Sequence, residues 1–537
     1  MGIKDLPNEL LIDILELVVE SKARDSIKTA STKAQNILPL IYASKHFHII
    51  SEVILYRMVR LASLNSLTKF LRTVLARPSL GLLVQRIELK NIKDPDKIST
   101  GTKVRQQMRI LRNQFPGTKE LEAVKQAVKT HGLSSAETRT WLSKIEQKHW
   151  WAIAPLVIFV LPNVDEVYIT DFNVDMNKPW IYFKQVLSRS QRTGKLKSLR
   201  IQHLYTTNGE YFERTEEEPC VHSMILDMLT DIAVDTFEIN RMRAPPTCEL
   251  RSYRDVEFRA RDAQYKILTP QDGHLSLRSL KIVHSTIATD CLRDILRRCP
   301  LLEVFHFGRS QYIYDQVFRP QYLVHSLRHL KRTLKELTVY GLPKTWSLEE
   351  RPDIQECELA NLGSLTEFEA LKELTVSDHL LMEQYPIDIR NNNRLEWRPT
   401  ENLLLCNLPK SLETLRIVEC DFKLIADQIK ELMSCEAEKV PKLKNIVIAL
   451  QWEMERGLRG SANGLVTEDM LCYGVFYQGR GFFRGRRKSP RLAKIKAKAK
   501  ELEALCKKHG VKMRIGDIVT GEGVGGQQFV LVTWPKV

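Results

Sequence analysis

The hexapeptide Leu334-Lys335-Glu336-Leu337-Thr338-Val339 occurs twice in this chain, and its second copy runs from Leu371 to Val376. It is the clearest case of a template, apolar-x-x-apolar-x-apolar, that recurs ten times along the sequence. The other copies begin at Val84, Val164, Leu196, Val234, Leu277, Leu302, Leu412 and Leu443. Self-similarity of this kind indicates a repeat architecture, in which each copy belongs to the same small structural unit.

Each copy ends in an alternation of apolar and polar residues, which predicts a half-buried β-strand. Patterns with helical spacing lie between the copies, for example at residues 291–296 and 424–432. Strands that alternate with helices predict a parallel sheet with helices outside it, so the expected fold class is α/β. A generic doubly wound α/β domain stays open as an alternative, but ten copies of one template favour a repeat array.

The template followed by a helix resembles the leucine-rich repeat, which implies an irregular solenoid over residues 61–537. Successive strand ends are 25 to 43 residues apart, and the Asn or Cys that usually follows the strand is mostly missing. The longer gap between residues 89 and 169 predicts one further unit or a helical insertion. The sheet of such a solenoid implies a binding surface for a target protein. Its outward strand positions would be Arg200, Glu238, Lys281, His306, Thr338, Thr375 and Arg416.

A different pattern opens the chain. The stretch Leu6-Pro7-Asn8-Glu9-Leu10-Leu11-Ile12-Asp13-Ile14-Leu15 has apolar residues at three- and four-residue spacing. It predicts an amphipathic helix that starts at Pro7, because proline suits the first position of a helix. Two more short helices are predicted over residues 36–47 and 50–56. Three such helices must pack on one another or on a partner to bury their apolar faces.

The three segments together resemble an F-box of the type common in fungal proteins. The resemblance rests on Leu-Pro-x-Glu-Leu-Leu-x-x-Ile-Leu at 6–15, Leu-x-x-x-Ser-Lys-x-Phe at 40–47 and Leu-Tyr-Arg at 55–57. It implies a three-helix F-box domain over residues 1–60, with a polar insertion at 21–36 that is longer than a compact F-box has. It also implies docking to a Skp adaptor and, through it, to a cullin.

The adaptor contacts that the resemblance implies are Leu6, Pro7, Leu10, Leu11, Ile14 and Leu15. Which of the last four face the adaptor, and which face the helices' own core, stays open.

The net charge of +16 is concentrated near the C-terminus, where residues 480–514 alone carry +12. Residues 473–488 interleave aromatic residues, glycine and arginine, a composition typical of nucleic-acid contacts. Alternatively, residues 473–515 form a basic loop and a helix that caps the solenoid, or they hold a nuclear-localisation signal. The residues expected for a nuclear-localisation or nucleic-acid role are Arg484, Arg486, Arg487, Lys488, Arg491 and Lys494.

The sequence lacks the common enzyme and metal motifs, such as a P-loop, Gly-x-Ser-x-Gly, His-Glu-x-x-His or an EF-hand loop. We therefore expect no catalytic residue, no metal and no cofactor. The longest uncharged apolar run, residues 152–162, is far shorter than the roughly 20 residues that span a bilayer, so no membrane association is expected. Ten scattered cysteines without Cys-x-x-Cys spacing suggest reduced thiols in a cytoplasmic or nuclear protein.

The resemblances imply a non-catalytic, target-binding subunit of an SCF-type (Skp–cullin–F-box) ubiquitin ligase. Its F-box would dock the Skp adaptor, and its solenoid would hold a target protein that the sequence does not identify. Two alternatives stay open. One is a nuclear or nucleic-acid-associated scaffold that uses the basic 480–514 segment and has a merely structural F-box-like cap. The other is an F-box protein that works outside a ligase.

Overall fold

The computed structural model divides the chain into two compact units, Met1–Phe318 with Glu522–Gln527, and Arg319–Gly521 with Gln528–Val537. The residues that the structure describes are 6–21, 39–90, 118–130, 134–147, 149–170, 182–183, 185–187, 196–205, 229, 232, 234–243, 275–285, 287, 289–309, 320–340, 362–381, 384–389, 394–399, 407–420, 422–450, 490–523 and 526–533.

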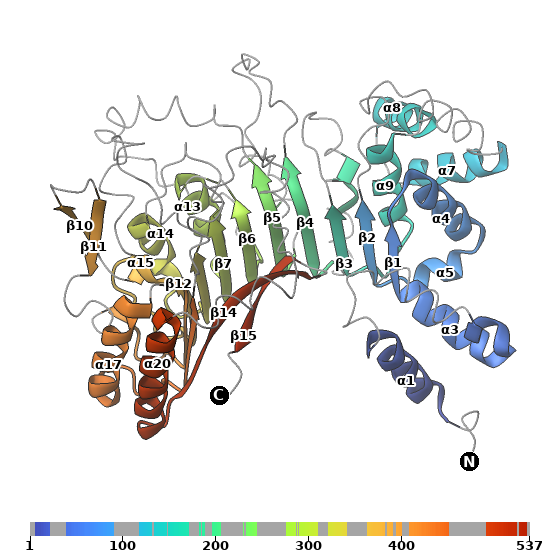
Figure 1. The fold of residues 1–537 in the computed structure, drawn as a ribbon. Coiled ribbons are helices and arrows are strands. Elements are labelled where there is room, and N and C mark those ends of the chain that lie inside the picture. Colours follow the sequence, from blue (N-terminus) through green and yellow to red (C-terminus); the bar gives the residue numbers. More distant parts are fainter. Residues whose placement is uncertain are drawn as a thin grey trace, which may run out of the picture. The chain divides into compact units, whose positions relative to one another are not determined.

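The first unit begins with helices and continues as a parallel sheet (Figure 1). Its helices are α1 (Asn8–Ser21), α3 (Lys45–Arg57), α4 (Leu64–Ala76), α5 (Pro78–Leu83), α7 (Thr118–Thr130), α8 (Ser135–Glu146), α9 (Trp150–Phe159) and α13 (Thr289–Arg297). Its strands are β1 (Met58–Leu61), β2 (Arg86–Lys90), β3 (Glu166–Thr170), β4 (Ser198–Tyr205), β5 (Thr236–Arg243), β6 (Ser279–Ser285) and β7 (Val304–Arg309). Each strand pairs in parallel with the next one along the chain.

The second unit is also α/β. Its helices are α14 (Pro320–Leu327), the 3-10 turn η2 (Arg328–Leu330), α15 (Asp378–Leu381), α17 (Phe422–Lys439) and α20 (Pro490–Lys508). Its strands β8 (Glu336–Tyr340), β9 (Glu373–Ser377), β12 (Thr414–Cys420), β13 (Asn445–Leu450) and β14 (Lys512–Gly523) pair in parallel in chain order. An antiparallel pair, β10 (Gln384–Ile389) and β11 (Arg394–Pro399), lies between β9 and β12 in the sequence. Strand β15 (Gly526–Thr533) follows β14.

All ten predicted strands are confirmed, and every template copy begins two residues before a strand. Register explains the pattern: Leu280 of β6 pairs with Phe237 of β5 and Phe305 of β7, which hold the same template position. The three apolar positions of all ten copies are at most 5% exposed, so they form the cores of the units. Each such burial contributes about 1.5–3 kcal/mol.

Backbone hydrogen bonds repeat with the template where the strands begin. The carbonyl of its second residue accepts the N–H groups of the second and third residues of the next copy. Lys197, for example, accepts from Asp235 at 3.1 Å and from Thr236 at 2.9 Å. Charged side chains at this position also pair with one another, as Arg278 and Glu303 do at 2.9 Å. The backbone groups at the start of each strand are therefore paired by hydrogen bonds between neighbouring copies, and no special turn sequence is needed there.

The described part of the long gap between residues 89 and 169 contains a helical insertion. Strand β2 pairs directly with β3, with Ile87 opposite Val167, so no strand lies between them. The described part of the gap is helical and contains α7, α8 and α9. Trp141 of α8 is fully buried, and its indole Nε1–H donates to the Ala152 carbonyl of α9 at 2.8 Å.

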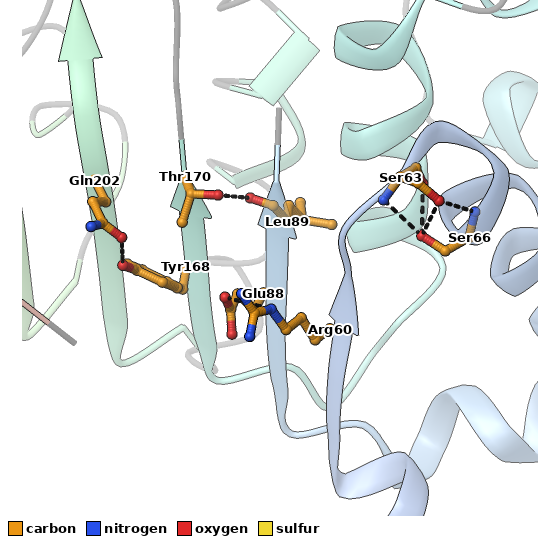
Figure 2. A network of polar contacts seen from close by, with 8 residues as sticks. All are labelled: Arg60, Ser63, Ser66, Glu88, Leu89, Tyr168, Thr170 and Gln202. Carbon is orange, nitrogen blue, oxygen red and sulfur yellow. Dashed lines mark hydrogen bonds and ion pairs between the residues drawn. The ribbon is translucent and has the colours of Figure 1, made fainter. Parts of the chain in front are cut away.

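The first unit also contains a strand that the template does not predict. Strand β1 follows α3 without a loop, and it pairs with β2. The turn after β1 is fixed by a capping box, in which the Ser63 hydroxyl accepts the Ser66 N–H at 3.0 Å and the Ser66 hydroxyl accepts the Ser63 N–H at 2.9 Å (Figure 2).

Two Leu→Ala substitutions in the first unit test this account of its core. We expect Leu280→Ala to lower the free energy of unfolding by about 2–5 kcal/mol, because it leaves a cavity at a fully buried template position. Leu301→Ala removes the same atoms from a side chain that is 52% exposed, and its cost should stay below about 1 kcal/mol. Urea unfolding followed by hydrogen exchange of β5 to β7 measures both. Equal costs would contradict the template assignment.

Candidate protein-docking surfaces

The N-terminal helix α1 divides its apolar residues between a buried and an exposed face. Leu11 and Leu15 are 1% and 9% exposed, and they form a small core with Ile50 of α3. Leu10 and Ile14 are 50% and 40% exposed, and their four-residue spacing places them on one face of the helix. The two faces of α1 therefore have different partners: one packs on the protein's own helices, and the other meets solvent.

Two further residues of the implied adaptor set flank the start of α1. Leu6 is partly buried against the same small core, together with Leu40 and Ile54. Pro7 is exposed, and its carbonyl accepts the Leu11 N–H at 3.1 Å. Helix α1 thus begins at Asn8, one residue after the predicted start at Pro7.

The next helices break at a different place from the predicted one. Residues 39–43 are helical, Ser44 is extended, and α3 then runs unbroken from Lys45 to Arg57. The predicted break after Phe47 is wrong, because the Ser44 hydroxyl accepts the Phe47 N–H at 3.2 Å and caps α3.

Exposed apolar side chains are concentrated in these N-terminal helices. Tyr42 is 84% exposed and Ile49 is 63% exposed. With Leu10 and Ile14 they make up four of the seven large exposed apolar side chains in the described part of the chain. Sequence reasoning missed Tyr42 and Ile49, although both are apolar residues of helical segments. Apolar exposure that gathers in one small module indicates a protein-docking surface.

Polar contacts join α3 to the elements that follow it. The Arg57 guanidinium Nε–H donates to the Gln85 amide oxygen at 2.8 Å, and Arg77 pairs with Glu52 at 3.0 Å. The Tyr56 ring stacks on Phe70 of α4, with the ring centres 6.3 Å apart. Because α3 also continues directly into β1, its orientation is fixed to the sheet of the first unit.

A second candidate surface is the polar side of the first unit's sheet, which Figure 2 shows from close by. Register aligns one polar position of every strand in a single row. That row contains Arg60, Glu88, Tyr168, Arg200, Glu238, Lys281 and His306. Opposite charges stand side by side in it: Arg60 pairs with Glu88 at 3.1 Å, and Arg200 with Glu238 at 3.7 Å.

Several members of this row are buried, although they occupy the outward positions of the strands. Glu88 is 5% exposed and Glu238 is 9% exposed, and burial raises the pKa of both carboxyl groups despite the neighbouring cations. Burial also raises the pKa of Tyr168, whose hydroxyl donates to the Gln202 side chain. In the second unit the equivalent positions Thr338 and Thr375 are buried too.

The six basic residues singled out near the C-terminus are not brought together at a described site. Arg484, Arg486, Arg487 and Lys488 lie outside the described residues. Arg491 and Lys494 belong to α20, in a part where side chains are not described. Their role in nuclear import or nucleic-acid binding stays a prediction.

Helix α20 itself packs against α17, beside which it lies in Figure 1. Leu502 is fully buried, and two lysines form ion pairs between the helices: Lys430 with Glu501 at 2.7 Å and Lys498 with Asp427 at 2.9 Å. A helix is therefore present within residues 473–515, as one of the alternatives predicts.

Among the described residues, no group of three or more His, Cys, Asp or Glu side chains is arranged to hold a metal ion. No helix in the described part of the chain has the length and apolar character needed to cross a membrane. Cys299 is a buried thiol, and burial raises its pKa to about 12, so it is a poor nucleophile.

No known protein-family model matches this sequence, and no curated protein matches it.

The buried carboxyl groups in the polar row of the first unit's sheet predict that the protein's stability depends on pH. A carboxyl whose folded-state pKa is raised favours the folded state at low pH, and this contribution is lost as the pH rises through the folded pKa. Glu238→Gln should therefore raise the protein's thermal stability at pH 7.5, and the gain should vanish below about pH 4. Thermal unfolding, with hydrogen exchange of β5 as the local readout, measures the difference.

Glu413→Gln is the matched control, because hydrogen bonds and charges of Lys444 and Lys372 lower the pKa of Glu413. Its wild-type carboxylate stabilises the fold above the ordinary glutamate pKa, so the substitution should reduce stability at pH 7.5. The same sign for both substitutions would contradict the burial argument.

Proposed function

We propose that residues 1–60 form an F-box and that the chain is the target-binding subunit of an SCF-type (Skp–cullin–F-box) ubiquitin ligase. The observation that carries this proposal is the division of the Leu-Pro helix α1. Its Leu11 and Leu15 pack inward on Ile50, while Leu10 and Ile14 remain exposed on one face beside the exposed Pro7. A helix that only capped a larger domain would be expected to bury these two large apolar side chains rather than expose them to water.

The exposed face has enough apolar area to anchor a partner. Burying Leu10 and Ile14 fully would contribute about 1.5–3 kcal/mol each. A few such side chains dominate the binding energy of many interfaces, even after the cost of association is subtracted. Tyr42 and Ile49 offer further apolar surface on the helices that follow.

The rest of the chain suits a receptor for a target protein. Its repeated strand units support a leucine-rich-repeat-like solenoid, in which the polar side of the sheet would hold the target. In this proposal the other subunits of the ligase perform the catalysis, and this chain brings the target close to them. A ligase subunit of this kind works in the cytoplasm or the nucleus, where a buried thiol such as Cys299 stays reduced.

Substitution of the exposed face tests adaptor docking. We expect the wild-type chain to co-purify with a Skp adaptor, and the double variant Leu10→Asp/Ile14→Asp to lose at least about tenfold in affinity, because two charges would enter an apolar interface. The fold should be retained, because both side chains point away from the small core. Isothermal titration with purified adaptor measures the affinity.

The matched control is Leu82→Asp/Leu301→Asp, which changes two leucines that are each 52% exposed outside the F-box region. This variant should bind the adaptor like wild type. Absence of adaptor binding by the wild-type chain, or equal binding by both variants, would overturn the proposal. Adaptor binding without cullin in the purified complex would instead favour an F-box protein that works outside a ligase.

A further inference from the structure

The second unit carries a surplus of positive charge along the edge at which its parallel strands begin. Five short segments lead directly into strands β8, β9, β12, β13 and β14, which are neighbours in the sheet of Figure 1. These segments are residues 328–335, 366–372, 408–413, 439–444 and 507–511. Together they contain eleven Lys or Arg residues and three Glu residues, a net charge of +8. We call the five segments the basic edge.

Backbone hydrogen bonds join these segments into one continuous edge. The carbonyls of Lys335, Lys372, Glu413 and Lys444 each accept an N–H group from the next strand or from the segment before it, in every case at 2.8 Å. Neighbouring strands are about 4.8 Å apart, so five strands make an edge about 19 Å long. The basic residues are therefore spread along a line and do not surround one point.

Most cations of the basic edge lack an ionic partner. Ten of the eleven are exposed, and Lys331 is partly buried. Arg332 pairs with Glu369, whereas Lys372 and Lys444 share Glu413. Seven others form no ion pair with any part of the chain that the structure describes: Arg328, Lys331, Lys410, Lys439, Lys442, Lys507 and Lys508.

The helix ends at this edge do not account for the surplus. Helices α17 and α20 end here, and each C-terminus carries about −0.5 elementary charge, which favours a nearby cation. Three glutamates of these helices precede the basic edge in the sequence, Glu436, Glu438 and Glu503, and with them a net charge of +5 still remains.

The first unit arranges the same positions differently. Its charged residues before the strands pair with one another, Asp165 with Lys197 at 3.3 Å and Arg278 with Glu303 at 2.9 Å. The repeat itself therefore does not require unpaired cations at the start of its strands.

We infer that the basic edge binds the phosphate backbone of a double-stranded nucleic acid. Charges spread over about 19 Å suit a polyanion better than a single small anion, and a duplex carries about eleven phosphates over that length. Residues 473–488, which belong to the same unit, have a composition typical of nucleic-acid contacts, and this supports the same class of ligand.

The exposed side chains of the edge favour a duplex over other polyanions. None of the large exposed apolar side chains of the described residues lies in the five segments, so the edge has no apolar anchor for a protein partner or a membrane. It also exposes no Phe, Tyr or Trp on which unpaired bases could stack. Lysines act on phosphates as point charges, so binding should be independent of sequence.

A salt-dependent binding measurement on the full chain tests this inference. The probe is a fluorescein-labelled DNA duplex of random sequence, 20 base pairs long, and fluorescence anisotropy gives its affinity between 50 and 200 mM KCl. Because each phosphate contact releases counterions, we expect the logarithm of Kd to rise with that of the salt concentration with a slope of about 4 to 6.

The test variant replaces four unpaired lysines of the edge, Lys410→Ala/Lys442→Ala/Lys507→Ala/Lys508→Ala. We expect it to lose at least about tenfold in affinity and to show a slope smaller by about three. The matched control is Lys69→Ala/Lys129→Ala/Arg139→Ala/Arg297→Ala, which removes the same charge from exposed positions of the first unit. Its affinity should change by less than about threefold, because distant charges are screened by salt. Thermal unfolding checks that both variants fold.

Equal losses in the two variants, or wild-type affinity of the edge variant, would overturn the inference. So would absence of duplex binding, or tighter binding of the wild-type chain to phosphatidylserine vesicles, to polyglutamate or to a 20-nucleotide thymidine strand. The measurement uses no adaptor, and the inference does not depend on the ligase function, so either proposal can fail without the other.

Discussion

Parallel strands that stack in register place like positions of successive repeats side by side, and the sheet of each unit depends on this arrangement. An apolar residue at the fourth or sixth template position meets another apolar residue on each neighbouring strand, as Leu280 meets Phe237 and Phe305. The same register also places each polar position beside the polar position of the neighbouring strand. These positions form rows in which opposite charges can stand side by side, as Arg200 and Glu238 do.

The N-terminal helices obey a different constraint, because a module of three short helices has a very small core. Leu11, Leu15 and Ile50 fill that core, and Leu10 and Ile14 of α1 stay exposed to water. The module is nevertheless held firmly to the first unit, since α3 runs into β1 and Arg77 binds Glu52. Under the proposed function, this connection would set the orientation of the target-binding sheet relative to the adaptor.

Much of the sheet could be predicted from the sequence, because the template has three apolar positions in six residues and occurs ten times. Those apolar positions are the buried ones. Strand β1 could not, because only four residues alternate there and no turn separates them from α3. The division of α1 into a buried and an exposed apolar face could not be predicted from the sequence either. Leu10, Leu11, Ile14 and Leu15 make one broad apolar stripe in the sequence, and only the packing on Ile50 separates its inner from its outer half.

The candidate surfaces differ in how far the sequence alone reveals them. The N-terminal surface is local, because Leu10, Ile14, Tyr42 and Ile49 all lie within the first fifty residues. The basic edge of the second unit takes its cations from five segments that are distant in sequence. Each segment by itself is an ordinary polar stretch before a strand, and only the strand order and register bring the charges together.

Hydrogen exchange of the full chain, with and without a purified Skp adaptor, tests the central claim most directly. The account predicts that the adaptor slows exchange in the helices at residues 8–21 and 39–49 and leaves β5 to β9 unchanged. Unchanged exchange in those helices at saturating adaptor, or protection confined to the sheet, would contradict it.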